Sequence, residues 1–247
     1  MKNKKTASNK VSLYRQRLPI LLSLASFALI IGLSPNSFIL LPHNIILFDM
    51  INTVRLGIFA GIAIAIGGTV FLNVGGIPGA VMFAFGLLAV VHYKLKLYTG
   101  TAGYVTRNSW GALGVILLAN IFGCFISALL VRYTTPSLIE SADAIVMKRL
   151  SLGPVKCGLL GIGCGLIMTT AVEFARKQQW LPLIFGVPVF ILCGFTHCIA
   201  DAYYYCMASA SLLADNALSV SAVYVAIVIG NLAGCNLYRL FVPKNQN

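Results

Sequence analysis

The stretch LGIFAGIAIAIGGTVFLNVGGIPGAVMFAFGLLAVVHY, from Leu56 to Tyr93, contains no Asp, Glu, Lys or Arg. A helix needs about 20 apolar residues to cross the hydrocarbon core of a bilayer, so this stretch is long enough to cross it twice. In its middle, the residues GGIPG, from Gly75 to Gly79, are turn residues that do not continue a helix. The stretch therefore predicts two transmembrane helices joined by a short turn.

Further stretches without these charged residues follow along the chain, and together they predict six helical spans. The expected spans are Arg55–Val74, Ile77–Val91, Trp110–Val131, Cys157–Phe174, Leu181–Phe195 and Ser219–Phe241. We expect helices because hydrocarbon offers no hydrogen-bond partner to an exposed backbone. The alternating polarity that a transmembrane barrel needs is absent from the sequence.

The composition excludes an ordinary soluble domain. Of 247 residues, 59% are hydrophobic and only 10% are charged, whereas a soluble domain carries about 25% charged residues. The net charge of +12 does not indicate a nucleic-acid partner, because six of the 18 basic residues lie in the first 17 positions, where they are typical cytoplasmic anchors. We therefore expect membrane lipid, and no nucleic acid, as the surroundings of this chain.

We divide the chain into an N-terminal extension, residues 1–48, and a six-helix transmembrane channel or transporter domain, residues 49–247. The extension is basic and then contains an apolar run of 16 residues, Leu18–Leu33. This run is short for a span. It is a signal peptide, an interfacial segment or an extra helix, and the sequence leaves the three alternatives open.

The third and sixth spans share a motif. Residues Asn120–Cys124 and Asn231–Cys235 both read Asn-x-x-Gly-Cys. With three spans in each half, the second half enters the membrane from the opposite side, which is typical of many channels and secondary transporters. The sequence therefore predicts two inverted three-helix repeats.

The middle span of each half is followed by a polar interruption. The first is KLKLYTG, Lys94–Gly100, and the second is FTHCIAD, Phe195–Asp201. Irregular backbone at membrane depth is tolerated only where it is buried in protein or lines a cavity. We therefore expect interrupted second and fifth helices that meet at a translocation path, where the ends of the half-helices offer amide groups to an anion.

His197 is the strongest candidate functional residue, because an ionisable side chain inside an apolar stretch is costly without a partner. The alternative is a structural histidine hydrogen-bonded to a neighbouring carbonyl. Thr99, in the other interruption, has a hydroxyl that could fix the imidazole tautomer. Asp201 follows His197 by four residues, so it could favour the charged imidazole or pair with Lys96.

Metal and cofactor chemistry are not indicated. Cys193, His197 and Cys198 carry metal-ligating atoms, but no fourth ligand is evident. The seven cysteines all fall in or beside apolar spans, where cysteine behaves as a small hydrophobe, so we infer no disulfide framework. Paired catalytic carboxylates and a cofactor fingerprint are lacking, and we expect no enzyme. We interpret Tyr203–Tyr205 as part of an interfacial aromatic belt.

Several segments resemble the formate/nitrite transporter family. Gly194–Tyr203, GFTHCIADAY, is similar to its signature Gly-Phe-Glu-His-Ser-Val-Ala-Asn-Met-Tyr. Lys96–Thr101, KLYTGT, stands where that family has Glu-Leu-Phe-Thr-Gly-Asn. Arg55–Thr69, Phe83–Leu87 and Gly230–Gly234 look like its first, second and last spans, in the same order.

The resemblance covers about residues 50–242. It implies a six-helix, aquaporin-like protomer in a homopentamer, with one pore per protomer for small monovalent anions such as formate, nitrite, hydrosulfide, lactate and acetate. We expect such a protein in the bacterial inner (plasma) membrane.

The resemblance also implies roles for individual residues. The central histidine of the family corresponds to His197 and its loop threonine to Thr99. The apolar residues of its constriction correspond to Phe83, Leu87, Leu97 and Phe190. Its basic vestibule residue has approximate counterparts in Lys148 and Arg149.

Four positions depart from the family pattern. Thr196 replaces the signature glutamate, Asp201 replaces the asparagine, and Lys96 replaces the glutamate of the other loop. Gly165 stands where the family usually has an asparagine. These changes rearrange the charge around the expected pore.

We therefore predict passage of a small weak-acid anion, either passive or by proton symport, with His197 as the proton donor. A protonated acid crosses an apolar constriction at a much smaller desolvation cost than its anion. The sequence does not decide whether His197 protonates the substrate or positions it by hydrogen bonding. The alternatives are a neutral-solute pore for water or glycerol, whose Asn-Pro-Ala loops are missing, and a non-transporting membrane homologue.

Overall fold

The computed structural model describes residues 41–106 and 109–241, and its regular elements there are all helices. The chain divides into two compact units, residues 1–49 and 50–247. The fold and site described below belong to the second unit. The predicted apolar run Leu18–Leu33 lies outside the described residues.

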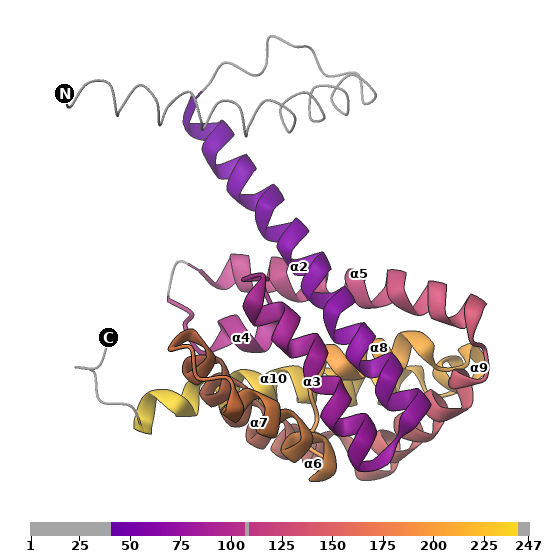
Figure 1. Ribbon diagram of the computed structural model, residues 1–247. Coiled ribbons are helices and arrows are strands. Elements are labelled where there is room, and N and C mark those ends of the chain that lie inside the picture. Colours follow the sequence, from indigo (N-terminus) through magenta and orange to yellow (C-terminus); the bar gives the residue numbers. More distant parts are fainter. Residues whose placement is uncertain (1–40, 107–108, 242–247) are drawn as a thin grey trace, which may run out of the picture. The chain divides into compact units, whose positions relative to one another are not determined.

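The helices follow one another with short connections (Figure 1). In chain order they are α2 (Leu41–Val74), α3 (Gly76–His92), α4 (Tyr98–Ala102), α5 (Trp110–Thr134), α6 (Leu138–Arg176), α7 (Leu181–Leu192), α8 (Cys198–Met207), α9 (Ala210–Asp215) and α10 (Ala217–Phe241).

The length and composition of these helices suit a bilayer. Within the described residues, α5, α6, α10 and the part of α2 from Asp49 to Val74 are long and apolar enough to cross a membrane. Helices α3 and α7 are apolar but shorter, because each ends where an interruption was expected. The prediction of an all-helical membrane protein is confirmed.

Helix α6 differs from the expected span Cys157–Phe174. It begins at Leu138 and contains a break at Gly153, whose φ of 75° is left-handed, followed by Pro154. Proline has no amide hydrogen to donate to the preceding turn, so the break divides α6 into two segments. The first segment carries several charged residues, and for this reason it was not expected to be part of a span.

The two interruptions are held in position by helices that pack closely against one another. Helix α10 packs along α6, α3 along α7, and α5 against α8 (Figure 1). Small residues also allow α5 to approach α2 closely, and α10 to approach α6. A Cβ atom added to Gly123 of α5 would lie 2.1 Å from the carbonyl oxygen of Ile58 in α2. One added to Gly234 of α10 would lie 2.0 Å from the carbonyl oxygen of Ile162 in α6.

The contacts of Gly123 and Gly234 occupy matching positions in the two halves, and the asparagines of the repeated motif also make matching contacts. A Cβ atom added to Gly61 would lie 2.1 Å from the carbonyl oxygen of Asn120, and one added to Gly165 would lie 2.4 Å from that of Asn231. Glycine at position 165 therefore has a packing reason. The helix pairs α2–α5 and α6–α10 thus touch at matching points of the Asn-x-x-Gly-Cys motif.

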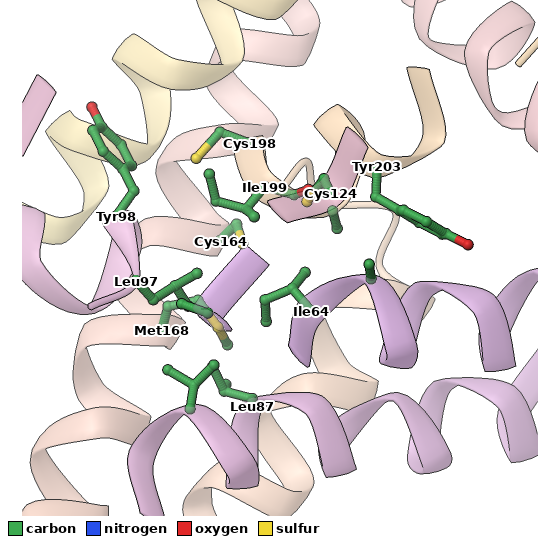
Figure 2. Packing of buried hydrophobic residues seen from close by; sticks show 14 of the residues in the cluster. Ile64, Leu87, Leu97, Tyr98, Cys124, Cys164, Met168, Cys198, Ile199 and Tyr203 are labelled. Atoms are coloured by element: carbon green, nitrogen blue, oxygen red, sulfur yellow. Dashed lines mark hydrogen bonds between the residues drawn. The ribbon is translucent and has the colours of Figure 1, made fainter. Parts of the chain in front are cut away.

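The core of the second unit is an apolar cluster to which most of the helices contribute. Figure 2 shows part of it, including Ile64, Leu87, Leu97 and Met168. The short helices α4 and α8 both begin within this cluster, since Tyr98 and Cys198 are buried. The core therefore surrounds the two interruptions.

Candidate functional site

The first interruption lies between α3 and α4. Lys94 has a left-handed backbone with a φ of 52°, and the amide of Leu95 donates to the carbonyl of Val90 over 2.9 Å. A left-handed residue followed by this hydrogen bond is the Schellman end of a helix. Leu97 then has an extended backbone and directly precedes α4.

The second interruption, between α7 and α8, repeats this geometry. Gly194 has a φ of 72°, and the amide of Phe195 donates to the carbonyl of Phe190 over 2.9 Å. His197 has an extended backbone and directly precedes α8. His197 therefore occupies, in the second half, the position that Leu97 occupies in the first.

Asn120 of α5 holds the first interruption. Its Oδ1 accepts a hydrogen bond from the amide of Tyr98 over 2.9 Å. Its Nδ2 donates to the carbonyls of Gly57 and Lys96 over 2.8 and 2.9 Å. One buried side chain thus joins α2, the interruption and the start of α4.

Asn231 of α10 makes the matching bonds in the second half. Its Oδ1 accepts from the amide of Cys198 over 2.8 Å. Its Nδ2 donates to the carbonyls of Gly161 and Thr196 over 2.9 and 2.8 Å. The hydroxyl of Thr196 donates to the carbonyl of Cys157 over 2.8 Å, so this departure from the family pattern also helps to fix the loop.

The cysteines of the repeated motif link one half to the other. Cys124 Sγ, in the first half, donates to the carbonyl of Ile199 over 3.4 Å. Cys235 Sγ, in the second half, donates to the carbonyl of Thr99 over 3.3 Å. The motif was recognised in the sequence as a repeat, but its role in holding the interruptions was not.

His197 and Thr99 meet where the interruptions approach each other. The imidazole is 2% exposed; its Nδ1 accepts from the amide of Ala200 over 3.2 Å, and its Nε2 lies 3.0 Å from Thr99 Oγ1. A neutral imidazole has one donor and one acceptor nitrogen. Because Nδ1 accepts, Nε2 carries the hydrogen and donates it to the Thr99 hydroxyl.

Of the two alternatives for Asp201, the pairing with Lys96 is not formed. Asp201 Oδ1 accepts from Arg149 Nε over 2.7 Å, and its Oδ2 accepts from the backbone amide of His197 over 2.9 Å. Lys96 Nζ instead donates to Thr53 Oγ1 over 2.7 Å. The reason is the first segment of α6, which packs against the second interruption and places Arg149 there.

The interpretation of Tyr203–Tyr205 as an interfacial belt is also wrong. All three residues are buried, because α8 packs against α5 and α6 inside the protein. The hydroxyls of Tyr203 and Thr69 are hydrogen-bonded over 2.6 Å.

The four residues expected at a constriction are buried in the apolar core, and one of them, Phe190, contacts His197. Phe83, Leu87, Leu97 and Phe190 are each at most 4% exposed. The rings of Phe83 and Phe190 meet edge to face with centroids 6.0 Å apart, and the ring of Phe190 stacks on the imidazole of His197 at 5.7 Å. An apolar ring therefore covers one face of the imidazole.

Leu97 borders a large cavity of about 880 Å³. The basic side chains among the described residues of its wall are those of His92, Lys94, Lys96 and Arg176, and none of these lining residues is a carboxylate. Arg176 is paired with Glu173. Neither Lys94 nor Lys96 forms a salt bridge with a described residue, so their positive charges are not neutralised in this way. The cavity is therefore basic.

His197 and Phe190 border a second, smaller cavity of about 120 Å³. Lys148, Arg149 and Asp201 also line it. We call Phe83, Leu87, Leu97 and Phe190 the buried apolar group. Its member Leu97 borders the large cavity, and its member Phe190 borders the smaller one together with the imidazole.

A metal site is not apparent in the described part of the chain, where His, Cys, Asp and Glu form no group of three that could hold an ion. All seven cysteines are free thiols.

Comparison with protein families matches residues 44–242 to the model of the formate/nitrite transporter family. The chain is a member of the formate/nitrite transporter family. The matched region includes both interruptions of this transporter homologue, and the resemblance seen in its sequence is confirmed.

Two solved structures share the fold of this family member. A pentameric formate channel with formate bound is 21% identical and has a TM-score of 0.67, with 78% of this chain and 95% of the channel covered. An FNT family ion channel is 16% identical and has a TM-score of 0.66, with 82% of this chain and 93% of the channel covered. Comparison with curated proteins finds no significant match.

We expect Asn231→Ala to destabilise the second interruption. The change removes three hydrogen bonds to buried backbone groups, and each unpaired group costs about 1–3 kcal/mol. Hydrogen exchange at the amide of Cys198 should accelerate and the unfolding temperature should fall. Asn73→Ala, at an exposed asparagine, is the control, and equal behaviour of the two variants would contradict this role of Asn231.

Proposed function

We propose that this chain carries small monovalent weak-acid anions, such as formate or nitrite, across a membrane through a pore that passes His197. Membership of a transporter family supports anion transport. The observation that carries the proposal is the meeting of His197 with Thr99, 3.0 Å apart, beside a buried apolar group that borders two cavities.

We also propose that the protomer consists of two inverted three-helix repeats in an aquaporin-like arrangement. The first repeat would be α2, α3 with α4, and α5; the second would be the apolar segment of α6, α7 with α8, and α10. The matching glycine contacts and the matching interruptions support this assignment. A homopentamer in the bacterial inner membrane is part of the proposal, and the assembly is supported by a structural neighbour that is a pentameric channel.

The basic cavities would collect the substrate. Lys94 and Lys96 face the large cavity, and Lys148 faces the small one. Clefts lined by one sign of charge raise the local concentration of ions of the opposite sign. An anion would therefore concentrate at both mouths of the pore.

The apolar group would prevent the free passage of ions. Moving an isolated carboxylate from water into an apolar medium costs on the order of tens of kcal/mol, whereas a neutral acid costs far less. Phe83, Leu87, Leu97 and Phe190 have no polar side-chain atom to replace the lost hydration. The substrate would therefore take up a proton at one mouth, cross as the neutral acid, and release the proton at the other.

His197 would stabilise the acid midway. Its Nε2 hydrogen points at the Thr99 hydroxyl, and an oxygen of the substrate can replace that hydroxyl as the acceptor. The amide of Ala200 keeps Nδ1 as an acceptor, so a second proton on the ring would break the cap of α8. This geometry favours hydrogen-bond donation by a neutral imidazole over proton transfer from an imidazolium.

Flux through the full-length protein in proteoliposomes should depend on external pH. We expect uptake of labelled formate and nitrite to rise as external pH falls, because a larger fraction of each substrate enters as the neutral acid. Sulfate, which stays charged, should not enter. Formate uptake that is independent of pH would contradict passage as the acid, and water flux alone would indicate a neutral-solute pore.

His197→Phe should abolish weak-acid flux. The ring keeps a similar size but loses the central hydrogen-bond donor, and loss of one such donor from a buried site lowers rates by about 100-fold or more. Thermal unfolding and size-exclusion profiles establish that the variant folds. Tyr133→Phe, at an exposed position on α5, is the control. A folded His197→Phe protein with unchanged flux would remove His197 from the mechanism.

A further inference from the structure

A buried ion pair forms part of the wall of the small cavity. Arg149 and Asp201 are 8% and 1% exposed, and their charged groups are 2.7 Å apart. The other titratable side chains that line this cavity are Lys148, His197 and Tyr204. Among the described residues of this wall, Asp201 is therefore the single carboxylate, beside the two permanent cations Lys148 and Arg149.

The pair fixes the backbone on both sides of the interruption. Asp201 accepts from the amide of His197 over 2.9 Å, and Arg149 donates to the carbonyl of Gly194 over 3.1 Å. These bonds hold the guanidinium of Arg149 against the carboxylate of Asp201. The positive charge of Arg149 is therefore neutralised within the wall. Lys148 is exposed and forms no ion pair with a described residue.

We propose that Asp201 determines the anion specificity of the small cavity by neutralising Arg149. This inference rests on the proposed function, because it concerns one mouth of the same pore. With Asp201 in place, the wall has the net charge of Lys148 alone. Without that carboxylate, two cations would face a cavity of about 120 Å³.

The consequence concerns release as much as entry. A pore conducts only if its ligand binds strongly enough to enter and weakly enough to leave. A single net positive charge attracts a monovalent anion without retaining it. Two adjacent cations in a partly buried site would favour a divalent oxyanion, which would occupy the mouth and block it.

The test compares the wild type with Asp201→Asn, Arg149→Gln and the double variant. Asparagine has nearly the same shape as aspartate, but it has one acceptor oxygen where Asp201 uses two. This change therefore removes the charge and keeps only one of the bonds to Arg149 and to the His197 amide. The double variant has the same cavity charge as the wild type. Sulfate is the probe, and its affinity is obtained from the rise in unfolding temperature of the purified full-length protein.

Charge neutralisation predicts a definite order. Asp201→Asn should bind sulfate about tenfold more tightly than the wild type, Arg149→Gln should bind it more weakly, and the double variant should return to the wild-type affinity. In proteoliposomes, sulfate added at the mouth formed by the small cavity should inhibit formate flux in Asp201→Asn at concentrations that leave the wild type active.

A purely structural pair predicts a different pattern. All three variants would unfold at lower temperature, none would bind sulfate more tightly than the wild type, and the double variant would not return to the wild-type sulfate affinity. This result would overturn the inference. Asp215→Asn removes the same charge at an exposed position on α9 and should keep the wild-type affinity. An equal effect of Asp215→Asn would show that net protein charge, and not Arg149, is responsible.

The comparison remains decisive if Arg149→Gln does not fold, because Asp201→Asn and Asp215→Asn alone separate the outcomes. Sulfate binding also requires no transport. A wild type that carries no weak acid, but whose variants follow the predicted order, would refute the proposed function and leave the role of Asp201 intact. The reverse result would refute this inference alone.

Discussion

A backbone amide in hydrocarbon has no water to bond, so every break in a membrane helix must be satisfied by the protein itself. Asn120 and Asn231 meet this requirement, each bonding three backbone groups around one interruption. Because both breaks are closed in this way, α4 and α8 can begin inside the apolar core. Thr99 and His197 then face each other at 3.0 Å. The chemistry proposed for this protein depends on that meeting.

The charged residues that depart from the family pattern fit the same framework. Asp201 is held between Arg149 and the backbone of the second interruption, while Lys96 bonds Thr53 and lines the large basic cavity. The two mouths of the proposed pore thus differ in kind. Among the residues that the structure describes, the wall of one mouth has lysines and no carboxylate, and the wall of the other has an arginine that is neutralised by a neighbouring aspartate. Such an asymmetry affects how readily an anion enters or leaves from each side.

Much of the fold could be predicted from the sequence because hydrocarbon imposes strong local rules. Uncharged stretches revealed the helices, and polar residues within them revealed the interruptions with His197 and Thr99. The Arg149–Asp201 pair could not be found in this way, since its members are 52 positions apart and Arg149 lies in a polar helix that resembles an external loop. The burial of Tyr203–Tyr205 was missed because tyrosine is equally typical of a membrane interface. Contacts between distant segments leave no periodic signal in one sequence.

The position of the hydrogen on the His197 ring decides whether the proposed central donor exists. The chain contains three histidines, so ¹⁵N-labelled imidazole signals can be assigned by NMR of the intact protein in lipid. If α8 is capped as described, His197 will give the signals of a neutral ring at neutral pH, with hydrogen on Nε2 and none on Nδ1. Hydrogen on Nδ1, in the other neutral tautomer or in a charged ring, would contradict the account.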